Sequence, residues 1–393
     1  IMVKKESKGR SSKTKSGSKV RKSEKIKLPK GVTLAKAKSH EIAPARLKKV
    51  EIEEVDPKRE KRIAIKIPRR AGKKLNLNKF GLTIHNALRK DVTGYILQVR
   101  RKDKLVQSRI WNWAQTPADK KKGWTQHTQM HLASVSKFLT AVGTVRALQD
   151  KGRSYNTKII NYLPSYWVKG KNIDKITFRH LLTHRSGFNV SGSSTDFKTM
   201  KKKVAAGVSA SKIGKSKSKY ENMNFGLCRI LIPVMRGDVP KGLHLPFSFN
   251  DAIWDIQTVN FFRKFMQSRV FSPAGVPNVG FVPKKTGNAL AYRHPHLNRK
   301  GWNSGDLRSV AGGAGFRLSS RQLLRVMHHV RRRNTIISAS KARYMLKNGF
   351  GIDQIINTTA GKIYNKNGLW RSKGRTEQCV VYFLPNDMEL TLF

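Results

Sequence analysis

One segment, residues 131–152, constrains the fold more than any other part of the sequence. Its apolar residues recur at helical spacing and would share one face of a helix: Val135, Phe138, Leu139, Val142 and Val145. Gly152 follows a polar last turn, which is typical of a helix end. The segment therefore predicts a long helix that packs against a core.

Strands and further helices are predicted on both sides of this helix. Residues 93–114 predict two strands around the turn RKDK, and residues 379–393 predict two more around the turn PND. Helical spacing also predicts helices over 76–90, 176–188, 221–236, 251–270 and 318–333. A strand pair, a mostly helical middle and closing strands indicate an α+β fold.

The chain is strongly basic. It has 393 residues with 81 Lys and Arg against 23 Asp and Glu, a net charge of +58. Such a surface repels itself unless a polyanion neutralises it, and nucleic acid does so with release of condensed counterions. The charge therefore predicts a nucleic-acid or other polyanion partner. Anionic membrane surfaces, cell-wall polymers and a merely soluble surface stay open as alternatives.

Composition divides the chain in two. Residues 1–75 hold 26 basic and 8 acidic side chains with few aromatics, and such a segment cannot bury enough apolar surface to offset its ordering entropy. We expect a basic tail over 1–75, disordered or ordered by a partner, and a folded domain over 76–393. Within the domain, residues 198–219 hold eight lysines and no acidic residue, which predicts a solvated loop.

Several classes of protein are disfavoured. Cys228 and Cys379 offer neither a disulfide framework nor a zinc-ligand pattern, so no metal or cofactor is expected. The sequence contains no apolar run of about 18 residues, so no membrane span is predicted. The start of the chain lacks the apolar stretch of a secretory signal, and Ile1 before Met2 fits a processed form.

Ser134 and Lys137 lie three residues apart at the start of the 131–152 helix, a spacing that places both on one helical face. A serine hydroxyl becomes a strong nucleophile when a neighbouring base takes its proton, and a desolvated lysine can do so because burial lowers its pKa. A helix N-terminus also favours a developing oxyanion. In a lysine-rich chain the same spacing also arises as a helix cap beside a solvated lysine.

Four more segments follow in order along the chain: LLTHRSGF (181–188), KYENMNFGL (219–227), AGGAGFRLSSRQLLRVM (311–327) and NKNGL (365–369). Together with LASVSKFLTAV they resemble the motifs of the β-lactamase-related serine hydrolases, which include class C β-lactamases and penicillin-binding carboxypeptidases. The resemblance covers about residues 76–393. It implies an antiparallel sheet flanked by helices, with an all-helical subdomain, behind the basic N-terminal extension.

The resemblance also implies a catalytic set. Ser134 would form the acyl-enzyme, and Lys137 and Tyr220 would share the proton transfers. Asn222 would orient substrate or Lys137, and Lys366 would hold a substrate carboxylate or tune Tyr220. In the third motif, which contains Gly368, the backbone N–H of Leu369 would complete an oxyanion hole with that of Ser134. The predicted catalytic residues are Ser134, Lys137, Tyr220, Asn222, Lys366, Gly368 and Leu369.

Other motif matches are interpreted as structural. The literal Lys-Thr-Gly at residues 285–287 comes too early in the chain to be the third motif, and His184 is interpreted as a structural residue of its turn. His328 and His329 have no carboxylate or cysteine near them in sequence, so they are not interpreted as metal ligands.

Two departures from the family pattern leave the function open. Relatives end with a helix packed on the sheet, whereas this chain ends at Phe393 after a predicted strand, and Asn367 stands at the middle of the third motif. We therefore take as the main hypothesis a β-lactamase-like domain that serves as a basic, nucleic-acid-contacting component of a large assembly. Its protein neighbours would be those of a ribosome, nucleoid or virion, and the domain would keep residual activity or none.

The alternative is an active serine esterase, peptidase or amidase with a Ser134 acyl-enzyme. A secreted β-lactamase is disfavoured because its substrates do not call for this charge. The compartment is left unknown, and a nucleic-acid-rich compartment or particle, such as a mitochondrial ribosome, nucleoid or virion, is favoured.

Overall fold

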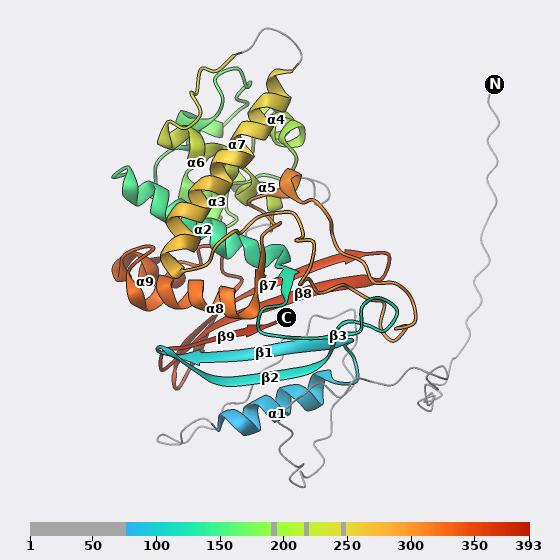
Figure 1. The fold of residues 1–393 in the computed structure, drawn as a ribbon. Coiled ribbons are helices and arrows are strands. Elements are labelled where there is room, and N and C mark those ends of the chain that lie inside the picture. Colours follow the sequence, from blue (N-terminus) through green and yellow to red (C-terminus); the bar gives the residue numbers. More distant parts are fainter. Residues whose placement is uncertain (1–75, 190–194, 216–219, 245–248) are drawn as a thin grey trace, which may run out of the picture. The chain divides into compact units, whose positions relative to one another are not determined.

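A computed structural model describes residues 76–189, 195–215, 220–244 and 249–393. The predicted tail, residues 1–75, lies outside the described residues, so both the tail and its boundary stay predictions. Within these ranges, seven strands form one antiparallel sheet in the order β3-β2-β1-β9-β8-β7-β6 (Figure 1). The predicted α+β architecture is confirmed.

The strands of this sheet come from the two ends of the described chain. They are β1 (Gly94–Arg101), β2 (Lys104–Gln115), β3 (Lys122–Gly123), β6 (Gln354–Thr358), β7 (Gly361–Ser372), β8 (Arg375–Leu384) and β9 (Met388–Leu392). The hairpins predicted over 93–114 and 379–393 are confirmed as β1–β2 and β8–β9. Pairing of β1 with β9, at Leu97 opposite Leu392, joins the two ends into one sheet.

The two faces of the sheet carry different helices. Tyr95, Leu97 and Val99 of β1 point to one face, where they pack against the apolar stripe of α1 (Leu77–Leu88). Ile96 points to the other face and joins the main core. Figure 1 shows α1 on one side of the sheet and α2, α8 and α9 on the other. The helix predicted over 76–90 is confirmed together with its buried stripe.

The remaining predicted helices are present with different bounds, and an additional one follows α8. The helices are α2 (Ser136–Asp150), α3 (Phe178–Leu182), α5 (Asn222–Gly226), α6 (Cys228–Arg236), α7 (Asn250–Met266), α8 (Ser320–His328) and α9 (Ala339–Lys347). Ser319 caps α8 by accepting from the N–H of Gln322.

The start of the central helix differs from the prediction. The α-helix begins at Ser136, and residues Ala133–Val135 form a separate 3₁₀ turn, η1. Upstream, β4 (Gln129–His131) pairs with β5 (Arg317–Ser319), which keeps the chain extended almost to the turn. Ser134 therefore lies in a tight turn just before the helix. The helix is also buried on nearly all sides, because it lies between the sheet and the helical part.

The lysine-rich segment 198–219 is not simply a solvated loop. Residues Phe197–Ala206 form helix α4, because Phe197, Met200 and Val204 share one buried face. Asp196 caps this helix by accepting from the N–H of Thr199 at 2.8 Å. The wrong prediction came from counting charges, whereas three apolar residues at helical spacing decide the local structure.

An ion pair with a fully buried guanidinium joins helices α6 and α7. Arg229 of α6 is fully buried, and its guanidinium donates to Asp255 of α7 at 2.8 Å and to the carbonyl of Thr195 at 2.7 Å. A buried guanidinium that loses its carboxylate keeps its desolvation cost without compensation. The pair therefore matters more for stability than the partly exposed pairs of the surface.

We predict that Asp255→Ala lowers the free energy of unfolding by about 3 kcal/mol, because it leaves the Arg229 charge buried and unpaired. Urea denaturation followed by circular dichroism measures the change. Asp238→Ala is the matched control: it removes one carboxylate from the partly exposed pair with Arg236, and should cost less than about 1 kcal/mol. Equal losses in the two variants would contradict the assigned role of the buried pair.

Candidate active site

The turn that carries Ser134 lies against strand β7. Gly368 of β7 approaches so closely that an added Cβ would lie 2.3 Å from the carbonyl oxygen of Leu132 and 3.1 Å from the backbone nitrogen of Ser134. Only glycine allows this approach. The contact fixes the β7 edge beside the Ser134 backbone, although residues 134 and 368 are far apart in sequence.

Lys137 is buried next to the serine. Its Nζ lies 3.0 Å from Ser134 Oγ and donates to the carbonyl oxygen of Gly313 at 2.7 Å. Burial, and then the neighbouring Lys366 ammonium, hold the pKa of Lys137 well below its ordinary value, while Asp353 acts in the opposite direction. A lysine in this setting can be neutral near physiological pH, and a neutral amine can accept the serine proton.

Tyr220 and Lys366 complete the cluster. Lys366 Nζ lies 3.3 Å from the Tyr220 hydroxyl, and the Tyr220 ring centroid lies 4.9 Å from Lys137 Nζ and 4.8 Å from Lys366 Nζ. The negative face of an aromatic ring attracts both amines. Tyr220 is 46% exposed, so the cluster opens to solvent at the phenol. The structure thus brings together the hydroxyl, two amines and phenol on which the predicted chemistry depends.

The edge of β7 supplies backbone donors at the same place. Strand β6 begins at Gln354, which lies opposite Asn365. From residue 366 onward, the same edge of β7 has no partner strand among the described residues. The N–H of Asn367 points to this edge, where it donates to Asp353 at 2.9 Å. Alternate residues of a strand direct their N–H groups to the same edge, so the Leu369 N–H points there too. This arrangement suits the predicted oxyanion-hole role of Leu369.

Asp353 is a site residue that the sequence analysis missed. Its carboxylate lies 2.5 Å from Lys366 Nζ and also accepts the Asn367 N–H, so it holds two consecutive residues of the third motif. Lys366 is 1% exposed, and this ion pair compensates a charge that would otherwise be buried alone. A predicted β6–β7 hairpin would have placed Asp353 beside Lys366.

His184 supports the tyrosine from behind. Its ring stacks on Tyr220 with centroids 4.4 Å apart, and its Nδ1 accepts the backbone N–H of Glu221 at 3.0 Å. Burial, with Lys137 and Lys366 nearby, lowers the pKa of His184 to about 3, so the ring is neutral. This contact set fits the structural role predicted for His184.

Asn222 is the predicted residue that the structure joins least to the cluster. It begins α5, and its side chain makes no hydrogen bond within the described part of the chain, to Lys137 or to any other group. Asn224, two residues later, is buried and accepts from Ser186 Oγ at 2.6 Å. The helical spacing of Asn224 with Cys228, four residues later, could have predicted that Asn224 lies on the buried side.

The early Lys-Thr-Gly lies elsewhere. Residues 285–287 line a different pocket together with Lys120 and Lys300, and the lysine that contacts Tyr220 is Lys366. In the described ranges, no group of three or more His, Cys, Asp or Glu side chains could hold a metal ion. None of the helices in those ranges has the length and apolar character of a membrane span.

Comparison with known proteins identifies the family. The family model described as Beta-lactamase matches residues 83–361, and the chain belongs to this family. No curated protein matches the sequence.

Solved structures show the same fold at low sequence identity. FmtA from Staphylococcus aureus is 15% identical, with a TM-score of 0.61 over 81% of this chain and 84% of that one. The octameric penicillin-binding protein homologue from Pyrococcus abyssi is 14% identical, with a TM-score of 0.59 over 81% and 73%. D-amino acid amidase from Ochrobactrum anthropi is 16% identical, with a TM-score of 0.56 over 81% and 90%.

The lowered pKa of Lys137 predicts a pH-dependent stability. Its folded pKa lies below the unfolded value, so between the two the unfolded chain binds one proton more, and stability rises with pH by up to about 1.4 kcal/mol per unit. The free energy of unfolding of the wild type minus that of Lys137→Met should therefore increase as the pH rises toward about 10.5.

Denaturant titrations at a series of pH values measure this difference. Lys347→Met is the control, since it removes an exposed lysine from α9, and its difference from the wild type should stay flat. A flat difference for Lys137→Met as well would show that Lys137 holds the same proton in both states.

Proposed function

We propose that the protein is a serine hydrolase that cleaves esters or amides through an acyl-enzyme on Ser134. One observation carries the proposal: a buried amine, Lys137 Nζ, lies 3.0 Å from Ser134 Oγ in a cluster that also holds Tyr220 and Lys366. The fold is shared with a D-amino acid amidase and with a hydrolase that has promiscuous acyltransferase activity. That likeness supports the class of reaction and leaves the substrate open.

Acylation follows from the contacts. Neutral Lys137 accepts the proton of Ser134, and Oγ attacks the carbonyl carbon of the substrate. The backbone N–H groups of Ser134 and Leu369 stabilise the oxyanion, and Gly368 sets the close approach that pairs them. Lys137 or the Tyr220 phenol then protonates the leaving alcohol or amine. Water attacks the ester carbonyl, which releases the acid and restores Ser134.

The Asp353 contact favours one of the two roles predicted for Lys366. Because the Lys366 ammonium already has a carboxylate partner at 2.5 Å, it does not need a substrate carboxylate. Its 3.3 Å contact with the Tyr220 hydroxyl remains available during proton transfer. We therefore assign Lys366 to tuning Tyr220, and Asn222 to contacting substrate, since its side chain does not reach Lys137.

The role in a nucleic-acid-containing assembly stays a prediction. It rests on the net charge of +58 and on residues 1–75, which lie outside the described ranges, whereas the hydrolase proposal rests on a located cluster of reactive groups. The two roles are compatible, because a basic surface and a sheltered catalytic cleft can belong to one domain. Protein neighbours and compartment remain unassigned.

A fluorophosphonate probe tests the proposal directly. The wild type should be labelled covalently, and Ser134→Ala should lose the labelling because it removes the hydroxyl that lies 3.0 Å from the Lys137 amine. Mass spectrometry of the peptide that contains residues 131–146 locates the adduct. Ser165→Ala, at an exposed serine, is the control and should be labelled like the wild type. An unlabelled wild type with intact circular dichroism would sink the hydrolase proposal.

Two variants should move the pH profile in opposite directions. Asp353 raises the pKa of Lys137 and Lys366 lowers it, and Lys137 must be neutral to act as the base. Asp353→Asn should therefore shift the acidic limb of the labelling rate to lower pH, and Lys366→Met should shift it to higher pH. Asp238→Asn, remote from the cluster, should leave the limb in place. Shifts of the same sign in both variants would show that Lys137 is not the titrating base.

A further inference from the structure

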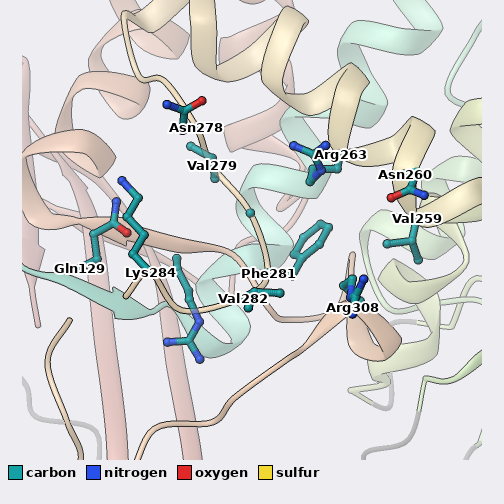
Figure 2. A pocket seen from close by; sticks show the side chains of 12 residues that line it. Gln129, Val259, Asn260, Arg263, Asn278, Val279, Phe281, Val282, Lys284 and Arg308 are labelled. Carbon is teal, nitrogen blue, oxygen red and sulfur yellow. The ribbon is translucent and has the colours of Figure 1, made fainter. Parts of the chain in front are cut away.

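Two pockets outside the catalytic cluster are lined by positive charge. The first, of about 370 Å³, has Arg263, Lys284, Arg308 and Arg317 in its wall (Figure 2). The second, of about 400 Å³, has Lys120, Lys122, Lys284, Lys285 and Lys300. Lys284 lines both. Gln129 of the first pocket donates its N–H to the carbonyl of Gly287 in the second at 2.8 Å, so we treat the pair as one basic groove.

Most of these charges are uncompensated. The eight cations of the basic groove face one acidic lining residue, Asp119, whose carboxylate already accepts from Tyr292 at 2.6 Å and from the N–H of Gly301 at 2.9 Å. Arg308 is paired with Asp306. In the described ranges, the other seven groove cations form no ion pair. A concave wall of one sign concentrates ligands of the opposite sign.

Arg317 is the most unusual of them. It is 2% exposed, and its Nη2 donates to Ser304 Oγ at 2.8 Å and to the carbonyl of Gly305 at 3.1 Å. Its Nε and Nη1 are buried without a hydrogen-bond partner among the described residues. Glu377 attracts this guanidinium, yet the carboxylate is bonded to His131 and forms no ion pair with Arg317. An anion in the adjoining pocket would supply the ion-pair partner that Arg317 lacks among the described residues.

The polar lining favours one kind of anion. The side chains of Asn260 and Asn278 line the first pocket and make no hydrogen bond within the described part of the chain, and Val282, in the same pocket wall, is 49% exposed. Figure 2 shows Asn260 coming from α7 and Asn278 from the loop that also carries Val279. Amide side chains hydrogen-bond base edges, and an exposed apolar side chain packs on a base or ribose. Inorganic polyphosphate would use neither.

We propose that the basic groove binds a single-stranded nucleic acid, with phosphates on the lysines and arginines and bases at Asn260, Asn278 and Val282. Each pocket has the volume of a small-ligand site, so nucleotides of a flexible strand can enter it, whereas a flat bilayer surface cannot. The inference does not rest on the hydrolase proposal, because neither pocket is lined by Ser134, Lys137, Tyr220 or Lys366. It gives the net positive charge a defined place on the folded domain.

Fluorescence anisotropy of a labelled oligouridine with the full-length protein tests the proposal. The double variant Arg263→Glu with Lys284→Glu should weaken binding roughly tenfold or more in about 100 mM salt, and should lower the slope of log K against log salt by about 1.4. Lys79→Glu with Lys362→Glu is the control, since these exposed lysines lie outside the groove and the charge change is equal. Circular dichroism spectra and melting temperatures of both variants should match those of the wild type, which shows that they fold.

Crosslinking separates the groove from the tail. Photo-crosslinks from oligo(4-thiouridine) should map to the segments that contain residues 259–263 and 278–285. Crosslinks confined to residues 1–75, or equal loss of affinity in the groove and control variants, would overturn the proposal. So would inorganic polyphosphate that displaces the RNA fully at equal phosphate concentration, or a groove variant that loses binding to phosphatidylserine vesicles while its RNA affinity is unchanged.

Discussion

Two buried lysine amines lie in one cluster, and the arrangement of the site follows from how their charges are accommodated. Lys137 and Lys366 are 0% and 1% exposed, so each ammonium would pay a large desolvation cost and would repel the other. The molecule accommodates them differently. Lys366 receives the Asp353 carboxylate, and Lys137, bonded to Ser134 and Gly313, keeps a strongly lowered pKa. The constraint that makes two buried lysines costly is therefore the one that makes the first of them a base.

The backbone holds this cluster through contacts between distant parts of the chain. The N–H of Leu132 donates to the carbonyl of Phe316, β4 pairs with β5, and Gly368 lies against the Ser134 turn. Ala133, just before the serine, has φ of 45°, a left-handed conformation that non-glycine residues adopt at a cost. A strained turn held by two strands and a close glycine contact presents the hydroxyl at a fixed position. Such rigidity is what an acyl-transfer site requires.

Local patterns in the sequence predict the elements that depend on local contacts. The hairpins β1–β2 and β8–β9 have turn residues between apolar strands, and α1 has a stripe that one sheet face buries, so all three follow from spacing. The start of α2 does not, because pairing of β4 with β5 overrides helix propensity up to residue 131. Helix α4 was hidden by its lysines, since charge says little about which face of a segment is buried.

The candidate site shows the same division. Ser134 and Lys137 are neighbours through helical spacing, and the order of the family motifs points to Tyr220 and Lys366. Asp353 was missed because its ion pair with Lys366 depends on the β6–β7 register, and no β6–β7 hairpin was predicted. Asn222 was expected by analogy to orient substrate or Lys137, and among the described residues its side chain makes no hydrogen bond to that amine. Motif order predicts which segments meet, and side-chain packing decides which atoms touch.

His131 is a buried ring whose pKa responds both to Arg317 of the basic groove and to Lys137. Burial lowers its pKa most, Arg317 and Lys137 lower it further, and Glu377, which is bonded to Nδ1 at 3.1 Å, acts in the opposite direction. Exposed charges farther away are screened within about 8 Å at physiological salt. A net charge of +58 can thus coexist with a lysine base, because the pKa of that base is set by burial and by its close neighbours Lys366 and Asp353.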